Sequence, residues 1–288
     1  MTFGLVLGAG GQAGEAFHRG VLRAMIDLGF DPRRADVIVG TSAGSVVASS
    51  LRRHAQPPGS EAGDAQAPRA RSKRSSTLGL LRRPRQALNA LLLAPEFTNG
   101  RQSVEFLREG LLGKHASWPA AGLFIVAVRR RDGRRVVFGA PGEPTPDVGA
   151  AVAASCAIPA YFAPVVIDGE AYVDGGLHSP TNADVLAGRN LHVVIVSSPM
   201  SMQVRSVGRR LDLPLRLLFH GYLVEETLVL RRRRTRVVTI EPDRAVLAVM
   251  GINMMDGRSI SDIEERAYEL ARSKLRTIPL AEAVRRAA

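Results

Sequence analysis

The chain has 288 residues, of which 45% are hydrophobic, enough for one large α/β domain or two small ones with a sizeable core. Its single cysteine, Cys156, excludes an internal disulfide framework and is typical of a reducing compartment. The formal net charge of +12 attracts polyanions such as nucleic acid or anionic lipid, although an arginine-rich proteome would give the same charge. The apolar runs are too short to span a bilayer, and no basic region precedes the first one, so we expect a soluble cytoplasmic protein.

The first fifty residues alternate between strand and helix patterns. Residues 3–8, "FGLVLG", predict a buried strand. After a glycine loop, residues 15–29 carry apolar side chains at helical spacing and end at Gly29, a usual helix C-cap. Residues 35–40 predict a second strand and residues 43–52 a second helix, an order that indicates a parallel sheet covered by helices.

Residues 53–77 interrupt this pattern because they are rich in Pro, Gly, Ala, Ser and charge. We expect them to form a mobile insertion within a single domain that spans residues 1–288. Residues 78–94 combine leucines with arginines, which predicts either a basic amphipathic helix at a membrane or an ordinary packed surface helix. Residues 103–112 predict a further helix.

The second half of the chain predicts more strands and helices. Its strongest short signal is a hairpin over residues 123–139 with an Asp132–Gly133 turn. Asp147 can cap the helix that follows it, and Ser261 with Glu264 forms a capping box for the last helix. The other expected elements are an irregular stretch between Pro159 and Pro164, short strands within 171–176, 191–198 and 235–242, and a long helix opened by Asp212 and Pro214 and closed by Arg231–Arg234.

The run Arg231–Arg234 does not indicate nucleic-acid binding. In the last turn of a helix, cations interact favourably with the helix dipole, and no aromatic residues are interleaved with this run. We therefore expect no nucleic-acid partner.

The loop "GAGGQAG", Gly8–Gly14, lies between a predicted strand and a predicted helix, where backbone N–H groups can bind an anion. One candidate anion is the pyrophosphate of a dinucleotide, since Gly8, Gly10 and Ala13 satisfy a loose dinucleotide-binding pattern. The other is the oxyanion of an acyl-transfer intermediate. A dinucleotide site needs an acidic residue after the second strand, and that strand ends instead in Gly40-Thr41-Ser42, which favours the oxyanion.

Ser42 lies between Gly40 and Gly44 at a strand-to-helix turn, a pattern typical of a nucleophile elbow, although Ser42 could also be a plain helix N-cap. None of the histidines is a convincing base, and His178 is the only serious competitor. Asp174 ends a predicted strand before Gly175 and Gly176, and could act as the base or simply as a turn residue. The histidines are His18, expected to be structural, His54 in the insertion, His115, His178, His192 and His220.

Three motifs in this order resemble the patatin-like phospholipase family: the loop with Gly10, Gly11 and Gly14, the elbow around Ser42, and the turn after Asp174. The segments "ASCAIPAYFAPV" and "DGGLHSPTNADVL" extend the resemblance. It implies a three-layer α/β/α sandwich with a mainly parallel sheet. It also implies a Ser-Asp dyad without histidine, with Ser42 as nucleophile and Asp174 as general base.

By the same resemblance, the N–H groups of Gly10 and Gly11 would form the oxyanion hole, and neither a metal nor a cofactor would be needed. The family's loop commonly has three consecutive glycines and then a basic residue, whereas this chain has Ala9 and Ala13 at those two places. Only backbone N–H groups are needed, so Ala9 is acceptable if its φ stays negative. The loss of the basic residue removes one charge near the site.

We accordingly expect a serine hydrolase that cleaves carboxylic esters of phospholipids or lysophospholipids through an acyl-enzyme. The positive charge favours peripheral contact with an anionic membrane, at the inner membrane surface. A non-catalytic lipid-binding protein on the same fold and a dinucleotide-binding oxidoreductase remain as alternatives.

Overall fold

The computed structural model describes residues 2–53, 118–203 and 211–276. The expected insertion, the leucine-rich stretch at 78–94 and the helix at 103–112 lie outside these ranges, apart from Arg53. Within them, no helix is both long and apolar enough to cross a membrane.

An eight-stranded sheet forms the centre of the described structure. Five strands are parallel and hydrogen-bonded in the order β3-β2-β1-β7-β8, and β4, β5 and β6 pair antiparallel at the β3 end. The strands are β1 Phe3–Leu7, β2 Val37–Thr41, β3 Gly122–Arg129, β4 Arg135–Phe138, β5 Val165–Ile167, β6 Glu170–Asp174, β7 Val193–Ser197 and β8 Arg236–Ile240.

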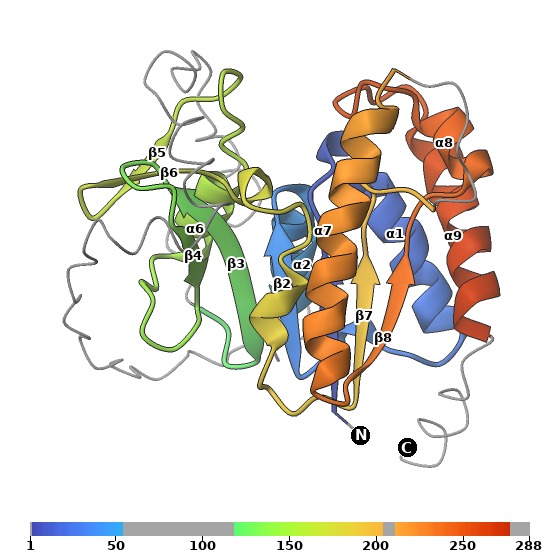
Figure 1. The fold of residues 1–288 in the computed structure, drawn as a ribbon, viewed down its shortest axis with the longest axis horizontal. Helices are drawn as coiled ribbons and strands as arrows, with labels where there is room; N and C mark the ends of the chain where they lie inside the picture. Colours follow the sequence, from blue (N-terminus) through green and yellow to red (C-terminus); the bar gives the residue numbers. More distant parts are fainter. Residues whose placement is uncertain (1, 54–117, 204–210, 277–288) are drawn as a thin grey trace.

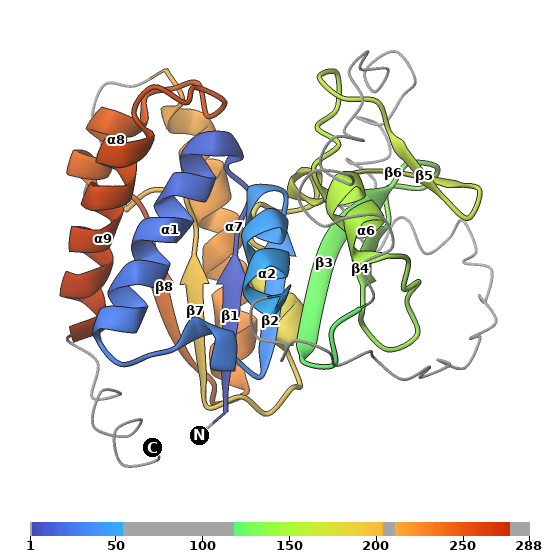
Figure 2. The same cartoon turned by 180° about the vertical axis from the view of Figure 1, so that it is seen from behind.

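Helices cover both faces of this sheet because the side chains of each strand alternate between two apolar clusters. In β1, Leu5 and Leu7 belong to one cluster and Val6 to the other. The first face carries α1 Gly11–Asp27, α2 Ala43–Arg53, α6 Val148–Ser155, α8 Arg244–Met250 and α9 Ile260–Arg276; the second carries α7 Leu213–Arg232 and the short 3₁₀ helix η4 Ala183–Leu186. Figure 1 shows α7 in front of the sheet, and Figure 2 shows α1, α2 and α9 in front of it. The expected three-layer sandwich is therefore confirmed.

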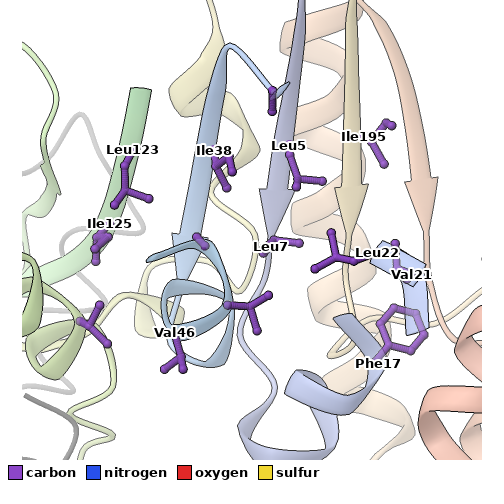
Figure 3. Packing of buried hydrophobic residues seen from close by; sticks show 14 of the residues in the cluster. Leu5, Leu7, Phe17, Val21, Leu22, Ile38, Val46, Leu123, Ile125 and Ile195 are labelled. Carbon is purple, nitrogen blue, oxygen red and sulfur yellow. The ribbon is translucent and has the colours of Figure 1, made fainter. Parts of the chain in front are cut away.

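Helix α1 packs its apolar stripe directly on the centre of the sheet. Phe17, Val21 and Leu22 lie against Leu5 and Leu7 of β1 and the side chains of β7 (Figure 3). All five are buried. Burial of each such side chain contributes about 1.5–3 kcal/mol, so this contact holds the start of α1, and the glycine loop before it, against the end of β1.

The sequence patterns located most elements and misplaced some boundaries. The hairpin formed by β3 and β4 is confirmed, and Asp147 caps α6 by accepting the N–H of Ala150 at 2.8 Å. The capping box is wrong, because α9 begins at Ile260 and Ser261 lies inside its first turn. Helix α1 begins at Gly11, four residues earlier than the apolar spacing indicated. Strand β5 and helix α8 were not predicted.

Candidate active site

Ser42 forms a tight elbow between β2 and α2. Its φ is +52°, in the left-handed region that non-glycine residues rarely adopt and that costs about 1–3 kcal/mol. The flanking glycines make the turn possible: a Cβ on Gly44 would lie 1.9 Å from the carbonyl oxygen of Leu7, and one on Gly40 would lie 2.5 Å from the Cα of Ser45. The elbow therefore packs directly on the end of β1, next to the glycine loop.

Ser155, the last residue of α6, holds this elbow. The N–H of Ser42 donates to the Ser155 hydroxyl oxygen at 2.9 Å, and that hydroxyl donates to the carbonyl oxygen of Val126 at 2.6 Å. The Ser45 hydroxyl donates to the carbonyl oxygen of Ser42 at 2.7 Å. Sequence reasoning missed Ser155, and its only signal was a place in the segment "ASCAIPAYFAPV".

Strands β2 and β6 meet end to end along one edge of β3. Strand β2 pairs with residues 122–126 of β3, and β6 pairs with residues 127–129. Strand β4 pairs with residues 125–128 and so overlaps both of these stretches. Because a strand has only two edges, β2 and β6 share the edge opposite β4. Thr41 pairs with Val126 and Asp174 pairs with the next residue, Ala127. The sheet thereby brings Ser42 and Asp174 together from opposite directions.

Asp174 is a buried carboxylate, with 5% of its surface exposed. Burial raises its pKa from 3.8 to about 6, while hydrogen bonds from the Ser42 hydroxyl and from the N–H of Gly176, the latter at 2.7 Å, act in the opposite direction. The close approach requires Gly175, since a Cβ there would lie 2.2 Å from the carbonyl oxygen of Val126. Ser42 thus lies beside a buried carboxylate of raised basicity.

The glycine loop presents two N–H groups at the start of α1. The N–H of Ala9 donates to the carbonyl oxygen of Pro180 at 2.8 Å and is already used. The N–H groups of Gly10 and Gly11 have no acceptor among the described residues. They lie at the positive end of a 17-residue helix, so they can bind a developing negative charge.

The glycines of this loop are needed for close packing. A Cβ on Gly10 would lie 2.7 Å from the Cα of Gly14, and Gly11 has a φ of +54°. Ala9 is not among the residues with positive φ, so alanine fits at that place. A Cβ on Gly176 would lie 3.3 Å from the Cβ of Ala9, which shows that the loop and the turn after Asp174 are in contact.

His18 supports the loop from inside the core. It is fully buried, its Nε2–H donates to the carbonyl oxygen of Gly8 at 2.7 Å, and its Nδ1 accepts from the Ser197 hydroxyl at 2.8 Å. This tautomer follows because a carbonyl oxygen can only accept. Burial lowers the pKa of His18 to about 4, so the ring is neutral. Its role is structural, as the sequence indicated.

The other described histidines occupy three different places. The N–H of His178 donates to the carbonyl oxygen of Gly175 at 3.1 Å, where the turn after Asp174 ends. His192 accepts from the N–H of Thr2 at the opposite end of β1, and His220 pairs with Glu241. His54 and His115 lie outside the described residues.

Cys156 lies beside the elbow and is buried, with its sulfur 3.8 Å from the Ser45 hydroxyl oxygen. Burial and the charge of Asp174 raise its pKa, so the thiol stays protonated and is a poor nucleophile. In the described ranges, no group of three or more His, Cys, Asp or Glu side chains is arranged to hold a metal ion.

One protein family and several solved structures are similar to this chain. A family model described as patatin-like phospholipase matches residues 5–187, a range that contains the glycine loop, Ser42 and Asp174. The crystal structure of VipD from Legionella pneumophila aligns with 96% of this chain and 67% of its own at 13% identity, with a TM-score of 0.44. The type III effector protein ExoU aligns with 95% of this chain and 53% of its own at 16% identity, with a TM-score of 0.40. No curated protein matches the chain at a significant level.

Proposed function

Because the chain belongs to the patatin-like phospholipase family, we propose that it is a serine lipid acyl hydrolase that uses Ser42 as nucleophile and Asp174 as general base. The observation that carries the proposal is that the Ser42 elbow and the buried Asp174 carboxylate meet at neighbouring residues of β3, where the Ser42 hydroxyl favours the ionised form of that carboxylate. A carboxylate with a pKa of about 6 is mostly ionised at neutral pH, yet it is a stronger base than an exposed aspartate.

The reaction follows from these positions. The Ser42 oxygen attacks the ester carbonyl carbon, and its proton moves to Asp174. The N–H groups of Gly10 and Gly11 stabilise the oxyanion of the tetrahedral intermediate. Collapse of this intermediate breaks the ester bond, and the leaving alkoxide takes the proton from Asp174. Water then attacks the acyl-enzyme in the same way and releases the fatty acid.

A phospholipid or lysophospholipid at an anionic membrane is the substrate that the surface favours. Helix α7 exposes apolar side chains to solvent, among them Leu215 and Leu218, and Leu211, just before the helix, is 89% exposed. The arginines Arg231–Arg234 at its other end are exposed, and the chain has a net charge of +12. Apolar and cationic groups on one surface suit an interface of acyl chains and acidic head groups. We place the protein in the cytoplasm, peripherally at the inner membrane surface.

Hydrolysis of p-nitrophenyl butyrate and labelling by a fluorophosphonate test the catalytic assignment. Ser42→Ala should abolish both, while Ser49→Ala should retain both. Ser49 is a matched control because it is a buried serine of α2, the helix that follows Ser42, and its hydroxyl donates to the carbonyl oxygen of Val46, one turn back. Equal hydrolysis by wild type and Ser42→Ala would refute the role of Ser42.

The alternative, a non-catalytic lipid-binding protein, makes a different prediction. Such a protein would bind phosphatidylglycerol vesicles equally well with or without Ser42 and release no fatty acid from them. Co-sedimentation with these vesicles, combined with analysis of the released lipid, therefore separates the two functions. Phosphatidylcholine vesicles control for the contribution of charge.

A further inference from the structure

Residues 179–183, "SPTNA", form a buried segment that contacts all three parts of the candidate site. We call it the linking segment. It follows the turn after Asp174 and leads into η4. In the described structure its side chains and carbonyl groups form hydrogen bonds toward β2, toward the glycine loop and toward α7.

Asn182 connects the serine elbow to the aspartate turn. Its side-chain Nδ2 donates to the Thr41 hydroxyl oxygen at 3.2 Å, to the carbonyl oxygen of Ser179 at 2.5 Å and, more weakly, to that of Gly175 at 3.4 Å. Thr41 directly precedes Ser42, and Gly175 directly follows Asp174. A single amide group therefore contacts the neighbours of both catalytic residues.

The orientation of this amide is fixed from its other end. Its Oδ1 accepts from the Arg135 guanidinium at 3.3 Å, and Arg135 makes a bidentate pair with Asp184 at 2.6 and 2.7 Å. A guanidinium can only donate, so the oxygen of Asn182 faces Arg135 and its NH₂ group faces Thr41. The φ of Asn182 is +53°, a conformation that asparagine tolerates better than most residues.

The next contact of the linking segment is with the glycine loop. The carbonyl oxygen of Pro180 accepts the N–H of Ala9 at 2.8 Å. A Cβ on Gly8 would lie 3.0 Å from the same oxygen, so the two chains are in close contact. Because Ala9 directly precedes Gly10, this bond sets where the N–H groups of Gly10 and Gly11 point.

Glu226 of α7 binds the linking segment through two hydrogen bonds. Its Oε2 accepts the Thr181 hydroxyl at 2.6 Å and the N–H of Ala183 at 2.8 Å. Glu226, Thr181 and Asn182 are almost completely buried. A buried carboxylate with directional hydrogen bonds is costly to displace, so it fixes the segment against a rigid helix.

We propose that Asn182 is a positioning residue which, on a segment held by Glu226, keeps the serine elbow, the aspartate turn and the glycine loop in their relative places. Its effect on catalysis rests on the proposed function. Asn182 acts through Thr41 and Gly175 and has no direct part in the chemistry. A misplacement of about 1 Å between a nucleophile, its base and an oxyanion hole can cost about 10²-fold in rate.

Asn182→Asp is the sharpest test because it keeps the size and the backbone preference but replaces the donating NH₂ group with an acceptor. We expect kcat for p-nitrophenyl butyrate to fall by about 10- to 100-fold with KM nearly unchanged, since uniform binding is not affected. Asn190→Asp is the matched control. Asn190 has the same φ of +53° but is exposed, away from the linking segment, and its variant should keep wild-type kcat.

Hydrogen–deuterium exchange provides a readout that does not depend on activity. Asn182→Asp should speed exchange in peptides that contain residues 8–14, 39–46 and 174–178, and Asn190→Asp should not. If Asn182→Asp does not fold, as judged by circular dichroism, Asn182→Gly replaces it, because glycine accepts the positive φ and adds no repulsion.

The outcomes separate the two proposals. A fall in kcat together with faster exchange in all three peptides supports both. Faster exchange in all three peptides with an inactive wild type supports the positioning role and overturns the proposed function. Unchanged exchange, or faster exchange confined to residues 179–184, overturns the positioning role, whatever the activity.

Discussion

Burial of Asp174 makes a measurable contribution to the pH dependence of stability. Burial raises the pKa of its carboxyl group from 3.8 to about 6, and a shift of about two units corresponds to about 3 kcal/mol. Because the folded state binds this proton more tightly, the stabilisation is complete below pH 3.8 and is lost as the pH rises through about 6. The free energy of unfolding is therefore about 3 kcal/mol lower at neutral pH, where Asp174 is ionised, than it is below pH 3.8, where Asp174 is protonated in both states.

Asp174→Asn removes this charge and keeps the shape, and its side-chain oxygen can still accept the N–H of Gly176. We expect the variant to match the wild type in stability at pH 4 and to exceed it by about 2–3 kcal/mol at pH 8, because a hydrogen-bonded amide is less costly to bury than a carboxylate. Urea denaturation followed by circular dichroism at pH values between these limits gives the difference. Esterase activity of the same variant should fall by about 10²–10⁴-fold.

Asp168→Asn is the control for this measurement. Asp168 is exposed, and its φ of +49° is one that asparagine also tolerates, so its replacement shows the effect of removing one surface carboxylate. A stability difference between Asp174→Asn and wild type that stays constant with pH would contradict the raised pKa. So would a variant that is less stable than wild type at pH 8.

Three further predictions concern the same site. The acid limb of kcat/KM should have an apparent pKa near the value of about 6 for Asp174, since the ionised carboxylate is the base; a limb near pH 4 would exclude this. Ser155→Ala should lower kcat by about tenfold or more, measured on p-nitrophenyl butyrate, because the N–H of Ser42 loses its acceptor. Gly44→Ala should lower the free energy of unfolding, measured in urea, by more than about 3 kcal/mol, because its Cβ would collide with the backbone of β1. Gly221→Ala should raise it by about 0.5–1 kcal/mol, because Gly221 lies in α7 and nothing is within 4 Å of an added Cβ.

The layer architecture could be predicted because it depends on the order of apolar and polar residues within short segments. The alternation in β1 and the helical stripe of α1 each follow from the side chains of one short segment. Asp147 shows the same for a cap. The start of α9 was misplaced because serines stand at both 259 and 261, and the local pattern does not decide which of them precedes the helix that begins at Ile260.

Only the site residues that belong to a sequence motif could be predicted. Ser42 follows from its flanking glycines, and Asp174 was assigned through the resemblance and not from its own pattern. Beyond their places in the two segments that extend the resemblance, Ser155 and Asn182 carry no local signal. Each acts on the elbow across a long stretch of chain, because 113 residues separate Ser155 from Ser42 and 141 separate Asn182 from Thr41. Such partners become visible only when the sheet brings them together.

The position of β1 in the sheet has a consequence for biosynthesis. This first strand pairs with β2 on one edge and with β7, about 190 residues later, on the other. Until Val193–Ser197 have left the ribosome, the second edge of β1 is an unpaired apolar strand, the kind of edge that recruits other chains. High contact order also slows folding, so we expect the nascent chain to depend on chaperones until the sheet closes.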